Sequence, residues 1–154
     1  MSSMILPFEM APQQGGLLCW AAVAVSLRRF YRKQESIDQI AFARSLLGAN
    51  CNQVCQPLRA LNHAGLRYRE HSGPIPLADI EQQLMSGHPV LIAARYFIGW
   101  HLLVLHGIGH GTQMMIADSL HGPSRASYAD LTAAYREHYL WSHTYCLAPA
   151  GDDE

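Results

Sequence analysis

The chain has 154 residues, of which 49% are hydrophobic, so it can bury one sizeable core and we expect a single domain over residues 1–154. Its 11 basic and 12 acidic residues give a formal net charge of -1, which argues against nucleic-acid binding. We expect neither a signal peptide nor a membrane span, because the start has no basic leader and no run of about 18 apolar residues occurs.

Three helices are predicted in the first half of the chain. The apolar positions of residues 19–33 cover most of a helix circumference until arginines appear near the end, a pattern typical of a buried helix. Ser36 is expected to cap a second helix that runs through residue 48. A third helix is predicted over about residues 52–64, where Gly65 can adopt the left-handed conformation that ends a helix.

The second half of the chain is rich in strand-forming segments separated by turn residues. Strands are predicted at residues 66–71, 89–96, 100–108, 113–117 and 139–147. A helix is predicted over residues 77–86, and a shorter one begins behind Ser127, which is a suitable cap. The order of elements indicates an α+β fold in which N-terminal helices pack on a C-terminal, curved antiparallel sheet.

Cys19 follows a glycine-bearing loop, residues 13–18, and stands in the first turn of the predicted buried helix. This position exposes its sulfur to the helix dipole and to free backbone N–H groups, and both favour the thiolate. The alternative is that Cys19 is a small buried apolar residue, which is the usual fate of a free cysteine. We interpret Cys19 as a candidate nucleophile.

The remaining cysteines are Cys51, Cys55 and Cys146, and they lack the paired spacing of a zinc site. Cys51 and Cys55, four residues apart, could share a metal with a histidine. No second ligand pair is visible, so we favour packing, or a bridge formed only under oxidising conditions. Neither a metal nor another cofactor is expected.

A glycine-rich turn at residues 107–111 predicts a hairpin that brings His101 near Asp118. A turn centred between Gly109 and His110 would pair His101 directly with Asp118, with Cβ atoms about 4.5 to 5.5 Å apart. A carboxylate at that distance orients the imidazole and leaves its other nitrogen free to take a thiol proton.

Each of these residues also has a simpler interpretation. His101 alone could be a polar residue at the mouth of a strand, and Asp118 alone could be a turn carboxylate satisfied by backbone N–H groups. The presence of both together with Cys19 favours a catalytic triad. The other histidines have no predicted acidic partner and are expected at the surface or in packing: His63, His71, His88, His106, His110, His121, His138 and His143.

Gln13 lies six residues before the Cys19-Trp20 pair that opens the predicted helix. With these motifs, and with a histidine and an aspartate on successive strands, the chain resembles the papain-like cysteine peptidases. The resemblance implies that Gln13 supplies the side-chain donor of the oxyanion hole, together with the backbone N–H of Cys19. Gln14 is the adjacent alternative. Trp20 and Trp100 would wall the cleft, unless they are core residues.

The chain is most similar to the compact bacterial branch of that family, which includes effector proteases and the peptidase domains of peptide exporters. Residues 19–22, residues 87–90 and residues 141–145 carry this likeness. Asp118 is followed by serine rather than the frequent proline of the branch. Exporter peptidases usually have glycine at the position of Trp20, so a free-standing protease ranks above an exporter domain.

The resemblance implies a thiol protease that cleaves a protein or peptide substrate through a thioester with Cys19. It would be a bacterial effector or toxin, cytoplasmic in the producing cell and delivered to a target cell by a specialised secretion system. An immunity protein or a host activating protein would control it. Three alternatives stay open: a glutamine deamidase or transglutaminase, a peptidoglycan amidase toxin, and an inactive binding module.

Overall fold

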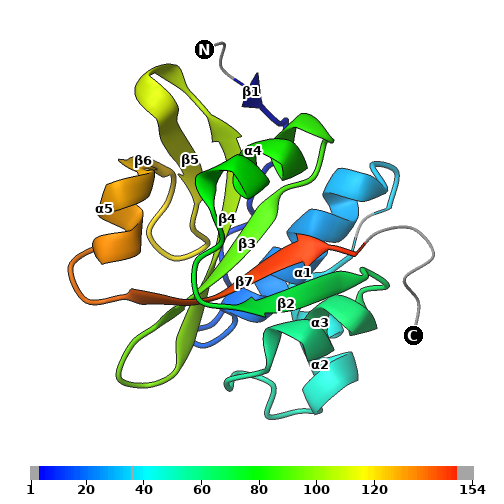
Figure 1. Ribbon diagram of the computed structural model, residues 1–154. Coiled ribbons are helices and arrows are strands. Elements are labelled where there is room, and N and C mark those ends of the chain that lie inside the picture. The colour runs from blue at the N-terminus through cyan, green and yellow to red at the C-terminus, as the bar shows by residue number, and fades with distance from the viewer. Residues whose placement is uncertain (1–3, 36, 149–154) are drawn as a thin grey trace.

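A seven-stranded antiparallel sheet organises the chain, and helices cover both of its faces (Figure 1). The computed structural model describes residues 4–35 and 37–148. The helices are α1 (Cys19–Tyr31), α2 (Gln39–Leu47), α3 (Pro57–His63), α4 (Leu77–Met85) and α5 (Tyr128–Ala133), with a short 3₁₀ turn, η1 (His110–Thr112). The strands are β1 (Met4–Ile5), β2 (Tyr68–Ser72), β3 (Val90–Arg95), β4 (Trp100–Ile108), β5 (Gln113–Ala117), β6 (Ser124–Ser127) and β7 (Leu140–Leu147).

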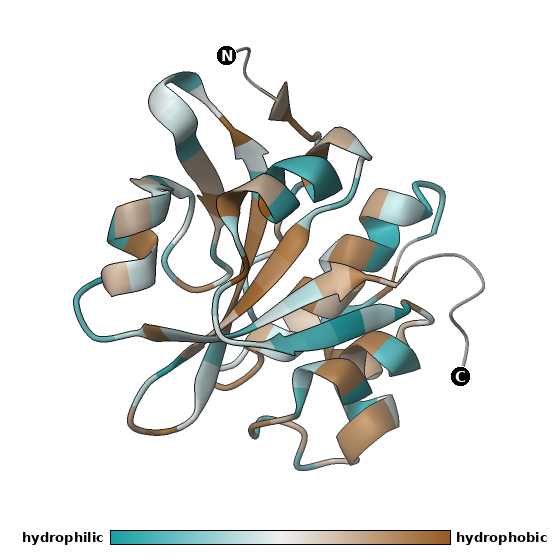
Figure 2. Ribbon diagram, in the orientation of Figure 1, coloured by the Kyte–Doolittle hydropathy of each residue, from teal (hydrophilic) through white to brown (hydrophobic). Residues whose placement is uncertain are grey.

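The strand order is β2-β7-β3-β4-β5-β6, and β1 pairs with the far end of β4. β7 therefore lies between β2 and β3, although it follows both of them by many residues in the sequence. β3 and β4 form the middle of the sheet and are its most hydrophobic part, whereas β2 at the edge is largely hydrophilic (Figure 2).

Each face of the sheet has its own hydrophobic core because alternate residues of a strand point to opposite faces. Leu102 and Val104 of β4 pack toward α1, α2 and α3, whereas Leu103 and Leu105 pack toward α4 and α5. The core beneath α1 also contains Trp20, Val23, Leu27, Phe42, Leu61 and Leu91. The core beneath α4 also contains Ile80, Leu84, Ile92, Ile116 and Leu131.

The α+β architecture expected from the sequence is confirmed, with several corrections to individual elements. Asp38 caps α2 by accepting a hydrogen bond from the backbone N–H of Ala41 at 2.8 Å; the expected cap, Ser36, lies outside the described residues. α3 begins at Pro57 rather than near residue 52, because proline suits the first turn of a helix and the preceding segment is held as a loop. β1 and β6 are short and were not predicted.

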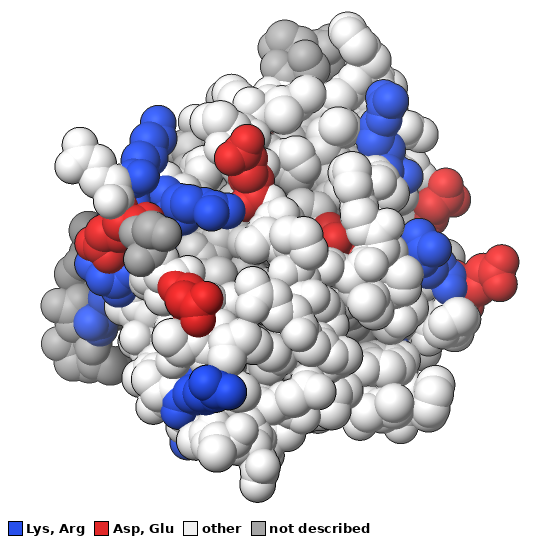
Figure 3. Space-filling view, turned by 180° about the vertical axis from the view of Figure 1, so that it is seen from behind, with Lys and Arg blue, Asp and Glu red and all other residues white. Residues whose placement is uncertain are grey.

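Charged side chains are spread widely over the face opposite to the view of Figure 1, where basic and acidic groups alternate around a large uncharged area (Figure 3). This arrangement agrees with the net charge of -1.

Within residues 4–35 and 37–148, no helix has the length and apolar character needed to cross a membrane.

Candidate active site

The loop before α1 is held in one conformation by contacts with a second loop. Asn52 Oδ1 accepts a hydrogen bond from the backbone N–H of Leu17 at 2.9 Å, and Leu18 N–H donates to the carbonyl of Gly15 at 3.1 Å. A Cβ atom on Gly15 would lie 2.8 Å from Asn52 Oδ1, so this close approach requires glycine. As a result α1 begins at Cys19, whose N–H belongs to the first-turn donors that have no acceptor within the helix.

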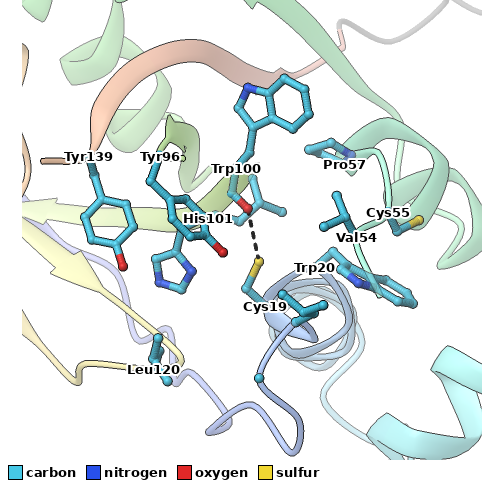
Figure 4. Close-up of a pocket in the computed structure, with 13 residues that line it drawn as sticks. Cys19, Trp20, Val54, Cys55, Pro57, Tyr96, Trp100, His101, Leu120 and Tyr139 are labelled. Carbon is cyan, nitrogen blue, oxygen red and sulfur yellow. Dashed lines mark hydrogen bonds between the residues drawn. The ribbon is translucent and has the colours of Figure 1, made fainter. Parts of the chain in front are cut away.

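The Cys19 sulfur faces a pocket between α1 and the start of β4 (Figure 4). It lies 3.8 Å from the carbonyl oxygen of Trp100, the residue before His101. Cys19 is 7% exposed, which fits a sulfur at the floor of a cleft. The pocket is lined by Gly16, Leu17, Cys19, Trp20, Val54, Cys55, Pro57, Tyr96, Trp100, His101, Leu102, Leu120 and Tyr139.

His101 and Asp118 form a buried hydrogen-bonded pair, with 2.7 Å between His101 Nε2 and Asp118 Oδ1. A carboxylate only accepts, so Nε2 donates and Nδ1 remains for the Cys19 side. Burial opposes protonation of His101, but hydrogen bonds with Asp118 and with the Cys19 side chain outweigh it and raise the pKa of His101 to about 9. The geometry therefore favours an imidazolium at neutral pH.

The two residues meet in a different way from the one predicted. Val104 pairs with Ala117, and the register then shifts beyond Leu105, so the expected direct pairing of His101 with Asp118 is wrong. β5 ends at Ala117, and Asp118 reaches His101 from the turn that follows the strand. The turn between β4 and β5 contains η1 and is centred on Gly111 rather than between Gly109 and His110, so Ile108 pairs with Met114. A bulge at His106 then changes the register by one further residue.

Asp118 is also bonded by groups that the sequence analysis did not assign to the site. Its Oδ2 accepts from Tyr135 Oη at 2.7 Å and from His121 Nδ1 at 2.8 Å. Its Oδ1 accepts from the backbone N–H groups of Leu120 and His121 at 2.8 and 3.0 Å. Burial disfavours the carboxylate, but the hydrogen bond and charge of His101, followed by hydrogen bonds from Tyr135 and the His121 backbone, hold the pKa of Asp118 below its ordinary value.

The expectation that His121 has no acidic partner is therefore wrong. An aspartate followed three residues later by histidine, before a Gly-Pro turn, was the available signal, because such a turn bends the chain back on the aspartate. Tyr139, which was expected only as a strand residue, packs against both rings, with centroids 5.7 Å from His101 and 5.9 Å from His121. It also lines the pocket.

The ligand atoms of His101, Asp118 and His121 lie within 4.8 Å of one another, which is the spacing of a group that could hold a metal ion. Both imidazoles instead hydrogen-bond to the carboxylate between them. Cys51 and Cys55 are buried and free, and burial raises the pKa of Cys55, as expected for a thiol in packing.

Gln13 belongs to the loop before Cys19 but is not among the residues that line the pocket. Its Nε2 donates to the carbonyls of Gly15 and Gly16 at 2.9 and 3.1 Å, and its Oε1 accepts from Ser119 Oγ at 2.8 Å. The backbone N–H of Gln13 also bonds to the carbonyl of Ser119 at 2.9 Å. Gln13 thus joins the loop before Cys19 to the residue after Asp118.

The two tryptophans occupy different positions. Trp20 is almost fully buried, donates from Nε1 to the carbonyl of Gln53 at 2.8 Å and packs against Phe42, so it belongs to the core while one edge reaches the pocket. Trp100 is 40% exposed and forms the outer wall of the pocket.

Solved structures of other proteins share the fold of this chain. The peptidase domain of Streptococcus ComA, a bifunctional ABC transporter of a quorum-sensing pathway, superposes with a TM-score of 0.64 at 16% identity, covering 92% of this chain and 99% of that one. A double-glycine-motif protease from an AMS/PCAT transporter, solved with its leader peptide, gives 0.63 at 14% identity over 94% and 95%. No curated protein sequence matches significantly.

At these identities the structural matches show a shared fold. The sequence model of the family described as papain-like cysteine protease AvrRpt2 matches residues 2–137. Because that match spans most of the chain, this protein belongs to the AvrRpt2 family of papain-like cysteine proteases.

Proposed function

We propose that the protein hydrolyses peptide bonds by acyl transfer to Cys19, with His101 as the proton-transfer group and Asp118 as the residue that orients it. The observation that carries the proposal is the convergence of Cys19 and His101 on one pocket (Figure 4), together with the 2.7 Å hydrogen bond between His101 Nε2 and Asp118. This is the arrangement that activates a thiol nucleophile.

The first step is proton transfer from the Cys19 thiol to His101 Nδ1. Asp118 fixes the proton on Nε2, so Nδ1 is the free base. The raised pKa of His101, about 9, favours the imidazolium that results. The Cys19 sulfur then attacks the carbonyl carbon of the substrate amide, and an electron pair moves to the carbonyl oxygen.

Collapse of this tetrahedral intermediate completes acylation. His101 gives its proton to the leaving amine as the C–N bond breaks, and a thioester remains on Cys19. Neutral His101 next removes a proton from water, whose oxygen attacks the thioester carbon. The C–S bond breaks, the sulfur recovers its proton from His101, and a carboxylic acid leaves.

The negative charge on the intermediate requires donors near Cys19. The backbone N–H of Cys19 and the side-chain amide of Gln13 are the proposed pair. Because Gln13 Nε2 donates to two loop carbonyls, it has to exchange one of these bonds for the substrate oxygen. The bond from Ser119 Oγ to Gln13 Oε1 keeps the amide group close while it does so.

A peptide or protein substrate is supported by the fold relative that was solved with a leader peptide. Trp100 and Tyr139, on two sides of the pocket, would hold that substrate over Cys19. Delivery as an effector or toxin, and control by an immunity or host protein, remain predictions from the family resemblance.

The test combines thiol labelling with product analysis. We expect the epoxide E-64 or iodoacetamide to modify Cys19 before Cys51, Cys55 and Cys146 near neutral pH, and His101→Ala to slow this. Mass spectrometry of treated peptide pools should show new peptide termini, which Cys19→Ala should reduce by roughly 10³-fold or more.

A matched control is His110→Gln, which alters an exposed histidine at η1 and should leave both readouts unchanged. Equal labelling of all four thiols would indicate an inactive scaffold instead. Conversion of glutamine to glutamate without new termini would identify a deamidase.

A further inference from the structure

A second cavity adjoins the pocket at Cys19. The two share Val54, Pro57 and Trp100, and the carbonyl of Trp100 lies 3.8 Å from the Cys19 sulfur. The second cavity has a volume of about 160 Å³, compared with about 20 Å³ at the nucleophile itself. It is lined by Val54, Gln56, Pro57, Glu70, Trp100, His143 and Tyr145. A substrate bound over Cys19 therefore has room for one long side chain beside the scissile bond.

The lining divides into an apolar wall and a polar end. Val54, Pro57 and Trp100 provide the apolar wall. The His143 ring packs edge-on against the Trp100 indole, with the ring centroids 6.4 Å apart and an interplanar angle of 69°. The polar end is formed by Glu70 of β2, which stands beside Tyr145 of β7.

Glu70 is held in position by its cross-strand neighbour. Glu70 and Tyr145 are paired in the β2–β7 ladder, so their side chains lie on the same face of the sheet. Tyr145 Oη donates to Glu70 Oε1 at 2.9 Å. Burial and this carboxylate raise the pKa of Tyr145 well above its ordinary value, so the hydroxyl stays a donor. Among the described residues, Tyr145 is the one hydrogen-bond partner of Glu70, which leaves Oε2 for a ligand.

We infer that this cavity is a substrate subsite for a lysine or arginine side chain close to the scissile bond; the inference rests on the proposed peptidase function. The methylene stem of such a side chain would cover Val54, Pro57 and the Trp100 ring, and its cationic end would pair with Glu70. An acidic side chain would be repelled by Glu70, and a short one would leave the cavity unfilled. Glu70 is then a specificity-determining residue, and Tyr145 its positioning residue.

The test uses irreversible peptidyl vinyl sulfones that differ in one residue. Lysine, arginine, norleucine or glutamate is placed in turn at each of the three positions nearest the reactive group, and the rate of Cys19 modification is measured. At one position we expect the basic probes to react about threefold faster than norleucine, which is the size expected for a charge pair with an exposed carboxylate such as Glu70. Glutamate at that position should be slowest.

Variants of Glu70 then assign the preference. In Glu70→Gln the basic and norleucine probes should react at equal rates, and in Glu70→Lys the glutamate probe should become faster than the lysine probe. Tyr145→Phe should weaken the basic preference without reversing it. The matched control is Glu81→Gln, which removes a carboxylate from α4 on the opposite face of the sheet and should change nothing.

The norleucine probe separates the two hypotheses. If it fails to modify Cys19 in the wild-type protein, the proposed peptidase function is overturned. If it reacts, but lysine and arginine give no advantage at any position, the subsite is overturned. The same holds if Glu70→Gln keeps the full basic preference while its norleucine rate matches the wild type, since that rate shows that the variant is folded.

Discussion

The Asp118 carboxylate is enclosed by donors on every side. It accepts five hydrogen bonds, which come from His101, Tyr135, the His121 ring and two backbone N–H groups. A buried carboxylate satisfied in this way stays ionised, and its charge acts on the imidazole bonded to it. Asp118 thus sets both the orientation and the proton affinity of His101.

The raised pKa of His101 predicts an alkaline limit to activity. His101 ordinarily has a pKa of 6.5, and the structure raises it to about 9, so the imidazolium persists at neutral pH and is lost as the pH rises through 9. The profile of kcat/KM against pH should therefore fall with a midpoint near 9. In Asp118→Asn the carboxylate charge is gone while burial remains, so the midpoint should move to lower pH.

The measurement is the initial rate of peptide cleavage, or of Cys19 labelling, between about pH 6 and pH 10, a range that spans ordinary His and Cys pKa values. His63→Gln, on α3 and bonded to Ser45, is a suitable control because it is remote from Asp118. If the alkaline midpoint of kcat/KM were the same in Asp118→Asn as in the wild type, Asp118 would not be what raises the pKa of His101.

The sequence predicted that Cys19, His101 and Asp118 lie close together, but not how Asp118 reaches His101. Cys19, His101 and Asp118 were identified from motif and spacing, and the structure places Cys19 and His101 on one pocket with Asp118 bonded to His101. The predicted ladder register was wrong because the turn after β4 contains η1 and is centred on Gly111, and His121 was missed because its partner is supplied by a turn. Bulges and turn geometry depend on tertiary contacts that residue patterns do not reveal.

The loop before α1 and the loop before α3 hold each other in place, and both line the pocket at Cys19. Asn52 binds the backbone of Leu17, and the carbonyl of Gln53 accepts the Trp20 indole N–H. The segment of residues 51–56 therefore stays non-helical against the loop before Cys19 and contributes Val54 to both cavities. This explains why α3 starts at Pro57: the predicted helix start near residue 52 was overridden by contacts with a loop far away in the sequence.

Gly15→Ala tests this dependence. Its new Cβ would lie 2.8 Å from Asn52 Oδ1 and 3.0 Å from Leu18 Cδ1, so the loop has to move and the Cys19 turn with it. Because a small displacement of the proposed nucleophile from the substrate carbonyl slows the reaction strongly, we expect kcat/KM to fall by roughly 10²-fold. The thermal unfolding midpoint should change less, because Leu18 is the one residue of this loop that belongs to a core.

Gly109→Ala is the matched control, because its Cβ would meet Met115 Sδ at 3.6 Å, an ordinary contact distance. Both variants would be compared by cleavage rate and thermal unfolding. Wild-type kcat/KM in Gly15→Ala would show that the loop conformation is not required.

Sheet order is the feature of the whole molecule that local patterns could not supply. The sequence predicted most of the strands and their antiparallel character, but not that β7 inserts between β2 and β3. Alternation and turn residues identify a strand without identifying its neighbours, which are chosen by packing between distant segments. The family match ends at residue 137, before β7 begins, so it too leaves this strand unassigned.

A chain that ends at residue 139 should therefore fail to fold. It would lack β7 and leave facing edges of β2 and β3 unpaired, with Tyr145 missing from the core beneath α1. Circular dichroism should show no cooperative thermal transition, and Cys19 should lose its selective labelling. A chain that ends at residue 148 is the control and should match the full-length protein; a cooperative transition in the shorter chain would refute the expectation.

The central place of β7 has a consequence for the cell that makes this enzyme. Synthesis proceeds from the N-terminus, so Cys19, His101 and Asp118 are all translated before the strand that joins the two parts of their sheet. Until residues 140–147 emerge, the polypeptide carries the reactive groups without the framework that aligns them. We therefore expect the nascent chain to gain peptidase activity only after residues 140–147 have left the ribosome.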